Sequence, residues 1–201
     1  MLQSADATDM TKPGLKSRFY QFRQFLSDSE SKAIRADHET TQRRKHIQDV
    51  FLIRGRPDQQ VAVTDDAVFA SRTRLASKKG VEHWEVDSRE PLPMRKAVLA
   101  MMGARQPSLR SAVTDVRNGD RLCEALSRHH ERICLEASVQ PLVRQDADAF
   151  LVEHRLSDGN CLKSIVLRSR EPRQLPATIR DLGLQPERSQ SLGDRLREMS
   201  S

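Results

Sequence analysis

Two groups of basic side chains are the part of this sequence best suited to chemistry, because Lys and Arg bind phosphate oxygens. Residues 41–56 contain five basic residues and one acidic residue, and residues 93–132 contain eight basic and four acidic residues. Affinity for phosphate needs several such contacts. A run as short as residues 43–45 also occurs on the solvated face of a helix, so both interpretations stay open. The candidate phosphate-binding residues are Arg43, Arg44, Lys45, Arg117, Arg121, Arg128 and Arg132.

Three of the six phenylalanines lie near the N-terminus and could form a surface for a partner. Phe19, Phe22 and Phe25 recur at the spacing of one helix face, which predicts an amphipathic helix within residues 15–35. Such a stripe usually packs on the core of its own protein. The alternative is a helix that docks on a protein partner or a membrane surface.

The cysteines and histidines match no catalytic or metal-binding motif. Cys123, Cys134 and Cys161 lack Cys-x-x-Cys spacing and lie in apolar patterns, which predicts reduced, buried thiols. Pairing of a thiol with His154 would create a nucleophile, but a core cysteine near a half-buried histidine is the commoner arrangement. The sequence also lacks phosphate-loop, dinucleotide-binding and metalloprotease motifs. We therefore predict no metal and no cofactor, and favour a protein that is not an enzyme.

The second basic group coincides with strong helix signals. Proline and glycine bound an apolar run at residues 94–102, a second helix is expected over 109–116, and Asp120 would cap a third over 120–131. Short helices followed by strands and a tight turn resemble the element order of a winged helix. That resemblance implies a helix-turn-helix-like segment over residues 93–132, whose last helix would enter the major groove of DNA.

Residues 149–170 contain the clearest strand signal, two apolar runs separated by a turn. Asp158-Gly159 predicts a two-residue type I′ turn, in which both central residues have positive φ. That turn would place His154 opposite Lys163. A shift of one residue would move one strand's apolar set to the other face.

Other local patterns predict short elements along the chain. We expect strands at residues 61–63, 81–86 and 133–135, and helices at 64–76, 177–182 and 192–199.

Composition and charge limit the fold classes that can be expected. The 201 residues are 37% apolar and 31% charged, with a net charge of +6 and only 4% aromatic residues. We expect an α+β protein in which short helices pack on a small antiparallel sheet or hairpin, with a loosely attached helical N-terminal region. The expected division is a disordered segment 1–14, a helical basic region 15–57, a main domain 58–185 and a polar tail 186–201.

These observations favour a basic binding or regulatory protein that contacts nucleic acid through residues 93–132 and the hairpin. The alternative is a protein-interaction module, such as an adaptor, a chaperone-like factor or an effector of a bacterial secretion system. The sequence has no run of 18 apolar residues, so we expect no transmembrane helix. We expect a cytoplasmic location. Export by a system that needs no hydrophobic signal is the open alternative. Oligomeric state does not follow from the sequence.

Overall fold

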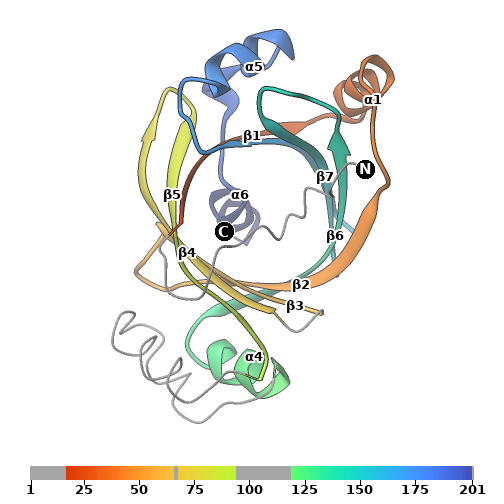
Figure 1. Ribbon diagram of the computed structural model, residues 1–201. Helices are drawn as coiled ribbons and strands as arrows, with labels where there is room; N and C mark the ends of the chain where they lie inside the picture. The colour runs from red at the N-terminus through yellow and green to blue at the C-terminus, as the bar shows by residue number, and fades with distance from the viewer. Residues whose placement is uncertain (1–16, 66–67, 94–118, 201) are drawn as a thin grey trace.

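Eight antiparallel strands close into a barrel in the computed structural model, which describes residues 17–65, 68–93 and 119–200 (Figure 1). Around the barrel the order is β1-β5-β4-β3-β2-β6-β7-β8, and pairing of β1 with β8 completes the ring. The strands are β1 (Arg18–Leu26), β2 (Arg44–Leu52), β3 (Gln59–Thr64), β4 (Val68–Lys78), β5 (Val81–Pro91), β6 (Glu131–Leu142), β7 (Asp148–Leu156) and β8 (Cys161–Ser169).

Short helices cover the outside of the wall and one of its ends. The described helices are α1 (Asp28–Asp37), α4 (Gly119–Ser127), α5 (Leu175–Asp181) and α6 (Leu192–Ser200), with a 3-10 turn at Pro186–Arg188. The start of α1 is capped by Ser27, whose hydroxyl accepts a hydrogen bond from the backbone of Glu30 while the Glu30 carboxylate accepts one from Ser27.

Much of the apolar packing lies outside the barrel, because side chains alternate between the lumen and the outer face along each strand. Phe22 and Ile165 point outward and pack with Leu175 and Ile179 beneath α5. A second outer cluster joins Phe51, Val61, Val63 and Phe69 of the wall to Leu122 and Leu126 of α4. Burial of one such side chain contributes about 1.5–3 kcal/mol, so these helices help to hold the wall together.

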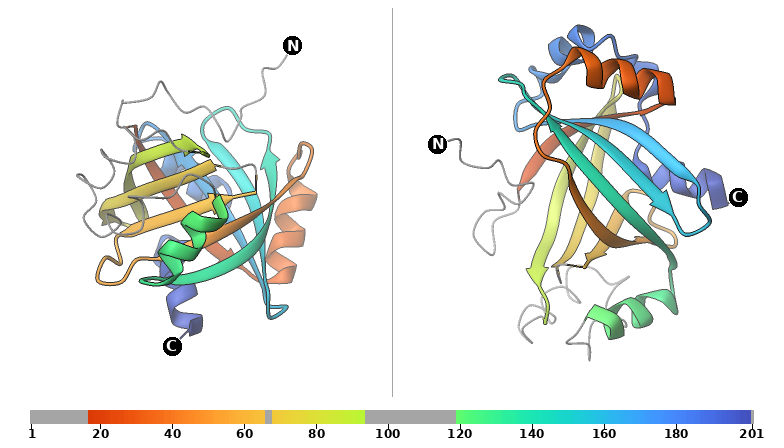
Figure 2. Two further views of the ribbon diagram at one scale, coloured as in Figure 1. Left: turned by 90° about the horizontal axis from the view of Figure 1, so that it is seen from below. Right: turned by 90° about the vertical axis from the view of Figure 1, so that its right-hand side faces the viewer.

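The C-terminal helix α6 closes one mouth of the barrel. Figure 1 shows α6 within the ring of strands, and Figure 2 shows it at one end of that ring. Its Leu192 and Leu196 pack among apolar side chains at that mouth, including Leu52, Leu135 and Leu162. The opposite mouth lies where β1 begins and β8 ends.

The expected α+β fold is wrong, since a closed barrel replaces the small sheet. The N-terminal region is not loosely attached, because β1 and β2 are part of the wall. The helix expected within residues 15–35 is the strand β1 followed by α1. Both faces of β1 are covered, with Phe22 beneath α5 and Phe25 beside α6. Apolar residues on both faces imitate the spacing of a helix. The helix expected at residues 64–76 is also largely strand, in β4.

The hairpin at residues 149–170 is confirmed as β7 and β8, but its predicted register is wrong by one residue. His154 lies opposite Leu162 rather than Lys163. The turn also differs. Gly159 has a φ of +89°, but Asp158 does not have a positive φ, since Lys79 is the only described non-glycine residue that does. The backbone amide of Leu156 donates to the carbonyl of Asn160, so the loop has three residues with a left-handed glycine, not a type I′ pair. This register turns Ser164 and Arg168 into the lumen and Ile165 outward.

The helix-turn-helix-like interpretation of residues 93–132 is also wrong. The helices expected at 94–102 and 109–116 lie outside the described residues, whereas α4 is confirmed. Leu122, Cys123 and Leu126 of α4 are buried against the wall, and the following β6 is a full strand of the barrel. Within the described ranges, no helix is both long and apolar enough to cross a membrane.

Removing one buried side chain from α6 tests its role in closing the mouth. Leu196→Ala should lower the free energy of unfolding by about 2–5 kcal/mol, because Leu196 is completely buried and its loss leaves a cavity. Met199→Ala on the same helix, where the residue is 39% exposed, should change that free energy by less than about 0.5 kcal/mol. Urea denaturation followed by circular dichroism measures both, and equal effects would contradict the described packing.

Candidate functional site: an arginine-lined barrel lumen

Three arginines from strands far apart in the sequence meet inside the barrel. Arg72 of β4 donates through Nη1 to Gln21 Oε1 of β1 at 3.4 Å, and Arg168 of β8 donates through Nε to the same oxygen at 3.2 Å. β5 lies between β4 and β1, so the contact between Arg72 and Gln21 spans β5, on the face where Trp84 of β5 lies against Arg72. Arg23, two residues after Gln21, faces the same space and donates to Ser164 Oγ at 3.1 Å. We call Arg23, Arg72 and Arg168 the lumen arginines.

The lumen arginines are held by neutral groups. Gln60 Oε1 accepts from Nε and Nη2 of Arg72 at 3.1 and 2.6 Å. The Arg72 guanidinium also lies 4.6 Å from the centre of the Trp84 ring, and that of Arg168 lies 5.5 Å from the centre of the Phe19 ring. Aromatic faces attract cations but carry no net charge. Within the described chain, no carboxylate forms an ion pair with a lumen arginine.

Burial and mutual repulsion leave these positive charges poorly compensated. Burial, followed by repulsion from Arg168, lowers the pKa of Arg23 to about 9, and the same causes lower that of Arg72 to about 9. Both therefore stay protonated at neutral pH. Burial also lowers the pKa of Arg168, although Asp148 opposes the shift. Glu82 attracts Arg23 and Arg72, but its carboxylate already accepts from Arg74 at 2.8 Å and from Trp84 Nε1 at 3.1 Å.

Several polar atoms around these charges have no hydrogen-bond partner among the described residues. Arg23 Nε, Gln21 Nε2 and His154 Nδ1 are fully buried and unsatisfied. Burial lowers the pKa of His154 well below its usual range, with Arg23 and His46 adding repulsion, so the ring is neutral at pH 7. Buried donors without partners are rare in folded proteins and often mark the place of a bound group. Here the unsatisfied N–H groups are those of Arg23, which is a lumen arginine, and of Gln21, which contacts the other two lumen arginines.

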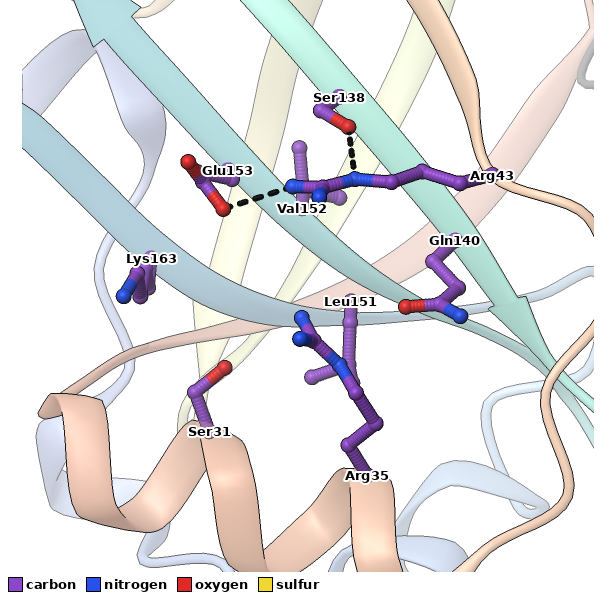
Figure 3. A pocket seen from close by; sticks show the side chains of 9 residues that line it. All are labelled: Ser31, Arg35, Arg43, Ser138, Gln140, Leu151, Val152, Glu153 and Lys163. Carbon is purple, nitrogen blue, oxygen red and sulfur yellow. Dashed lines mark hydrogen bonds and ion pairs between the residues drawn. The ribbon is translucent and has the colours of Figure 1, made fainter.

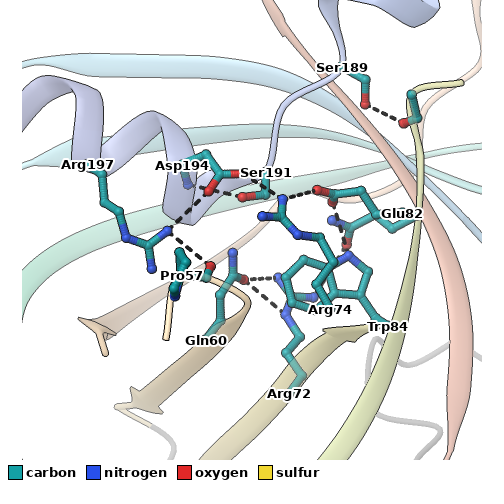
Figure 4. A network of polar contacts seen from close by, with 12 residues as sticks. Pro57, Gln60, Arg72, Arg74, Glu82, Trp84, Ser189, Ser191, Asp194 and Arg197 are labelled. Carbon is teal, nitrogen blue, oxygen red and sulfur yellow. Dashed lines mark hydrogen bonds and ion pairs between the residues drawn. The ribbon is translucent and has the colours of Figure 1, made fainter. Parts of the chain in front are cut away.

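A network of polar contacts joins α6 to this site (Figure 4). Arg74 of β4 contacts both Glu82 of β5 and Asp194 of α6, the latter at 2.6 Å. Asp194 also pairs with Arg197 of its own helix. Helix α6, which closes the mouth, is therefore linked through Arg74 to the Glu82 carboxylate, which also accepts a hydrogen bond from Trp84.

A hollow lies outside the barrel, between α1 and strands β6, β7 and β8 (Figure 3). Arg43 there donates to the Ser138 hydroxyl and to Glu153, the latter at 2.7 Å. Lys163 pairs with Asp28 at 2.6 Å. Since carboxylates already neutralise these two cations, this hollow is a weaker anion site than the lumen.

The described members of the predicted basic set do not come together as one site. Lys45 pairs with Glu136, Arg128 with Glu124, and Arg132 forms two hydrogen bonds of 2.9 Å to Asp49. Arg44 begins β2, Arg121 is exposed on α4, and Arg117 lies outside the described residues.

The three predicted partner-binding phenylalanines do not share one face either. Phe22 is completely buried beneath α5, whereas Phe19 faces the lumen and Phe25 lies beside α6. The predicted thiols are confirmed as unpaired, but only Cys123 is buried, and Cys134 and Cys161 are exposed. In the described residues, no group of three or more His, Cys, Asp or Glu side chains could hold a metal ion.

Sequence reasoning missed the residues that form the lumen site. Polar residues at alternate positions of β1, Gln21 and Arg23, and of β4, Arg72 and Arg74, are the only local signal. The same alternation is typical of an ordinary sheet with one face in water. Only closure of the barrel turns those positions inward.

The comparisons with known proteins show the fold. No protein-family model matches the sequence, and no curated protein matches it. Among solved structures, the chain is similar to a "putative adenylate cyclase" from Bacillus halodurans, with 11% identity, coverage of 90% of this chain and 96% of that one, and a TM-score of 0.51. It is also similar to the PH1012 protein from Pyrococcus horikoshii OT3, with 9% identity, coverage of 89% and 98%, and a TM-score of 0.50.

The predicted contact with DNA through a helix-turn-helix-like segment is wrong, because the barrel fold shared with these structures replaces that segment's expected context. Its basis was an element order over residues 93–132, whereas the strands on either side of that segment are parts of one barrel. The chain therefore has the fold of these proteins, and its chemistry must be argued from the lumen.

Replacing Arg23 by an apolar residue tests whether its buried charge destabilises the fold. Arg23→Met should raise the free energy of unfolding by about 1–4 kcal/mol, because Arg23 is only 4% exposed and pairs with no carboxylate in the described part of the chain. The matched control is Arg128→Met on the exposed face of α4, which should change that energy by about 0.5 kcal/mol or less. Urea denaturation at neutral pH measures both. A clear loss of stability in Arg23→Met would show that the guanidinium supports the fold.

Proposed function

We propose that the barrel lumen binds a small phosphorylated molecule carrying several negative charges. The observation that carries the proposal is the group of three lumen arginines held by neutral partners, next to unsatisfied N–H groups of Arg23 and Gln21. An anion placed among them would supply the missing charge and accept the missing hydrogen bonds. Guanidinium groups suit phosphate because their planar N–H groups match its oxygen geometry.

The number of the cations favours a chain of phosphates over a single one. The lumen arginines come from β1, β4 and β8, and the guanidinium groups of Arg72 and Arg168 converge on one oxygen, Gln21 Oε1. The Bacillus halodurans neighbour is described as a "putative adenylate cyclase", and a chain of phosphates would fit the charge distribution of the lumen. The proposal concerns binding and assigns no reaction to this chain.

A cytoplasmic location is part of the proposal. The three cysteines are unpaired, and two of them are exposed, as is usual for proteins kept under reducing conditions.

Titration calorimetry with inorganic tripolyphosphate at low salt tests the proposal. The wild-type protein should bind tripolyphosphate more tightly than pyrophosphate, and pyrophosphate more tightly than orthophosphate, because each added charge meets a further arginine. Arg72→Gln and Arg168→Gln should each weaken binding by about tenfold to a hundredfold, the usual effect of losing a hydrogen bond to a charged group. Arg128→Gln, which changes an exposed arginine, should leave the affinity unchanged.

Two results would overturn the proposal. One is the absence of tripolyphosphate binding by the wild-type protein at low salt. The other is equal weakening by Arg128→Gln and Arg168→Gln, which would place the anion on the outer surface. Citrate provides a further comparison, since binding as tight as that of tripolyphosphate would contradict a phosphate site.

A further inference from the structure

The side chain of Gln60 fixes the position of Arg72 in the lumen. Gln60 lies on β3, is 7% exposed, and accepts two hydrogen bonds from one edge of the guanidinium. Trp84 covers one face of the same group. The third nitrogen, Nη1, has only the long contact of 3.4 Å to Gln21. Gln60 and Trp84 therefore hold Arg72 while its Nη1 remains the group most available to a ligand.

Gly193 of α6 lies directly behind the Gln60 amide. A Cβ atom at this position would be 2.8 Å from Gln60 Nε2, closer than a real Cβ approaches a neighbour. The backbone of Gly193 is helical and not left-handed, so its conformation alone does not call for glycine. A larger residue here would therefore have to displace the end of the Gln60 side chain.

A second set of contacts leads from the same helix to the other support of Arg72. Asp194, the next residue, pairs with Arg74, and Arg74 pairs with Glu82. Glu82 Oε2 accepts from Trp84 Nε1 at 3.1 Å, which fixes the ring beneath Arg72 (Figure 4). Ser191 holds the start of α6 by accepting a hydrogen bond from the Asp194 backbone at 3.0 Å. The position of α6 thus acts on both groups that orient Arg72.

We infer that α6 is part of the anion site and that Gly193 and Gln60 are positioning residues for Arg72. The inference rests on the proposed function and extends it, because it assigns a binding role to a helix that contributes no cation to the lumen cluster. Gly193 allows the helix to come close enough to hold the Gln60 amide in place. A larger residue would displace that amide and, with it, the guanidinium.

Gly193→Ala, studied by calorimetry with tripolyphosphate, tests the inference. The variant should bind about tenfold more weakly than the wild type, since displacement of a binding group by about 1 Å has effects of this size or larger. In an Arg72→Gln background the same substitution should have no effect, because the group it displaces is gone. This double-mutant cycle separates positioning of Arg72 from a general loss of structure. Met199→Ala on the exposed part of α6 is the control and should bind like the wild type.

A second variant covers the case in which Gly193→Ala moves the whole helix. Gln60→Met keeps the volume of the side chain and removes the acceptor of Arg72, and it should give the same tenfold loss and the same dependence on Arg72. Wild-type affinity in both variants, or an equal loss in the Arg72→Gln background, would overturn the inference. Failure of the wild-type protein to bind tripolyphosphate would instead overturn the proposed function itself.

Discussion

The lumen of the closed barrel holds three guanidinium groups, and no carboxylate of the described residues pairs with any of them. This uncompensated charge is the main constraint on the structure. Gln21 accepts from two of the guanidinium groups with one oxygen, and Ser164 and Gln60 supply the other hydrogen bonds. Amides and hydroxyls satisfy N–H groups but do not neutralise charge. A lumen of this kind costs stability, because desolvation of an unpaired cation is unfavourable.

The distribution of apolar residues compensates for this polar interior. Helices α4 and α5 bury large apolar side chains against the outer face of the wall, and α6 buries Leu192 and Leu196 at one mouth. In an ordinary small barrel the lumen would itself hold the apolar core. Here the middle of the lumen holds charged side chains instead. The covering helices therefore supply part of the hydrophobic core.

The same arrangement explains why the site is suited to an anion. Burial, followed by repulsion from Arg168, lowers the pKa of Arg23 and Arg72. The negative charge of a bound polyphosphate would offset both effects, and its oxygens would accept hydrogen bonds from these groups in a region shielded from water. Ligands that bind only the folded state stabilise it. The unfavourable charge in the lumen and the affinity of the proposed site are thus two results of one arrangement. Groups held ready for a ligand commonly reduce stability in this way.

Local structure was largely determined by the sequence. The strand pattern at residues 81–86, the hairpin at 149–170, and the helices at 120–131, 177–182 and 192–199 were all predicted near their observed places, because turn residues and apolar spacing act between neighbours in the chain.

Tertiary structure decided everything that depends on distant pairing. Strand β1 looked like a helix because α5 and α6 cover its two faces. The register of the hairpin was decided by Gly159 in a three-residue loop, and it set which residues of β8 face the lumen. Arg23, Arg72 and Arg168 lie on strands that meet only when the ring closes, and no local period records that closure.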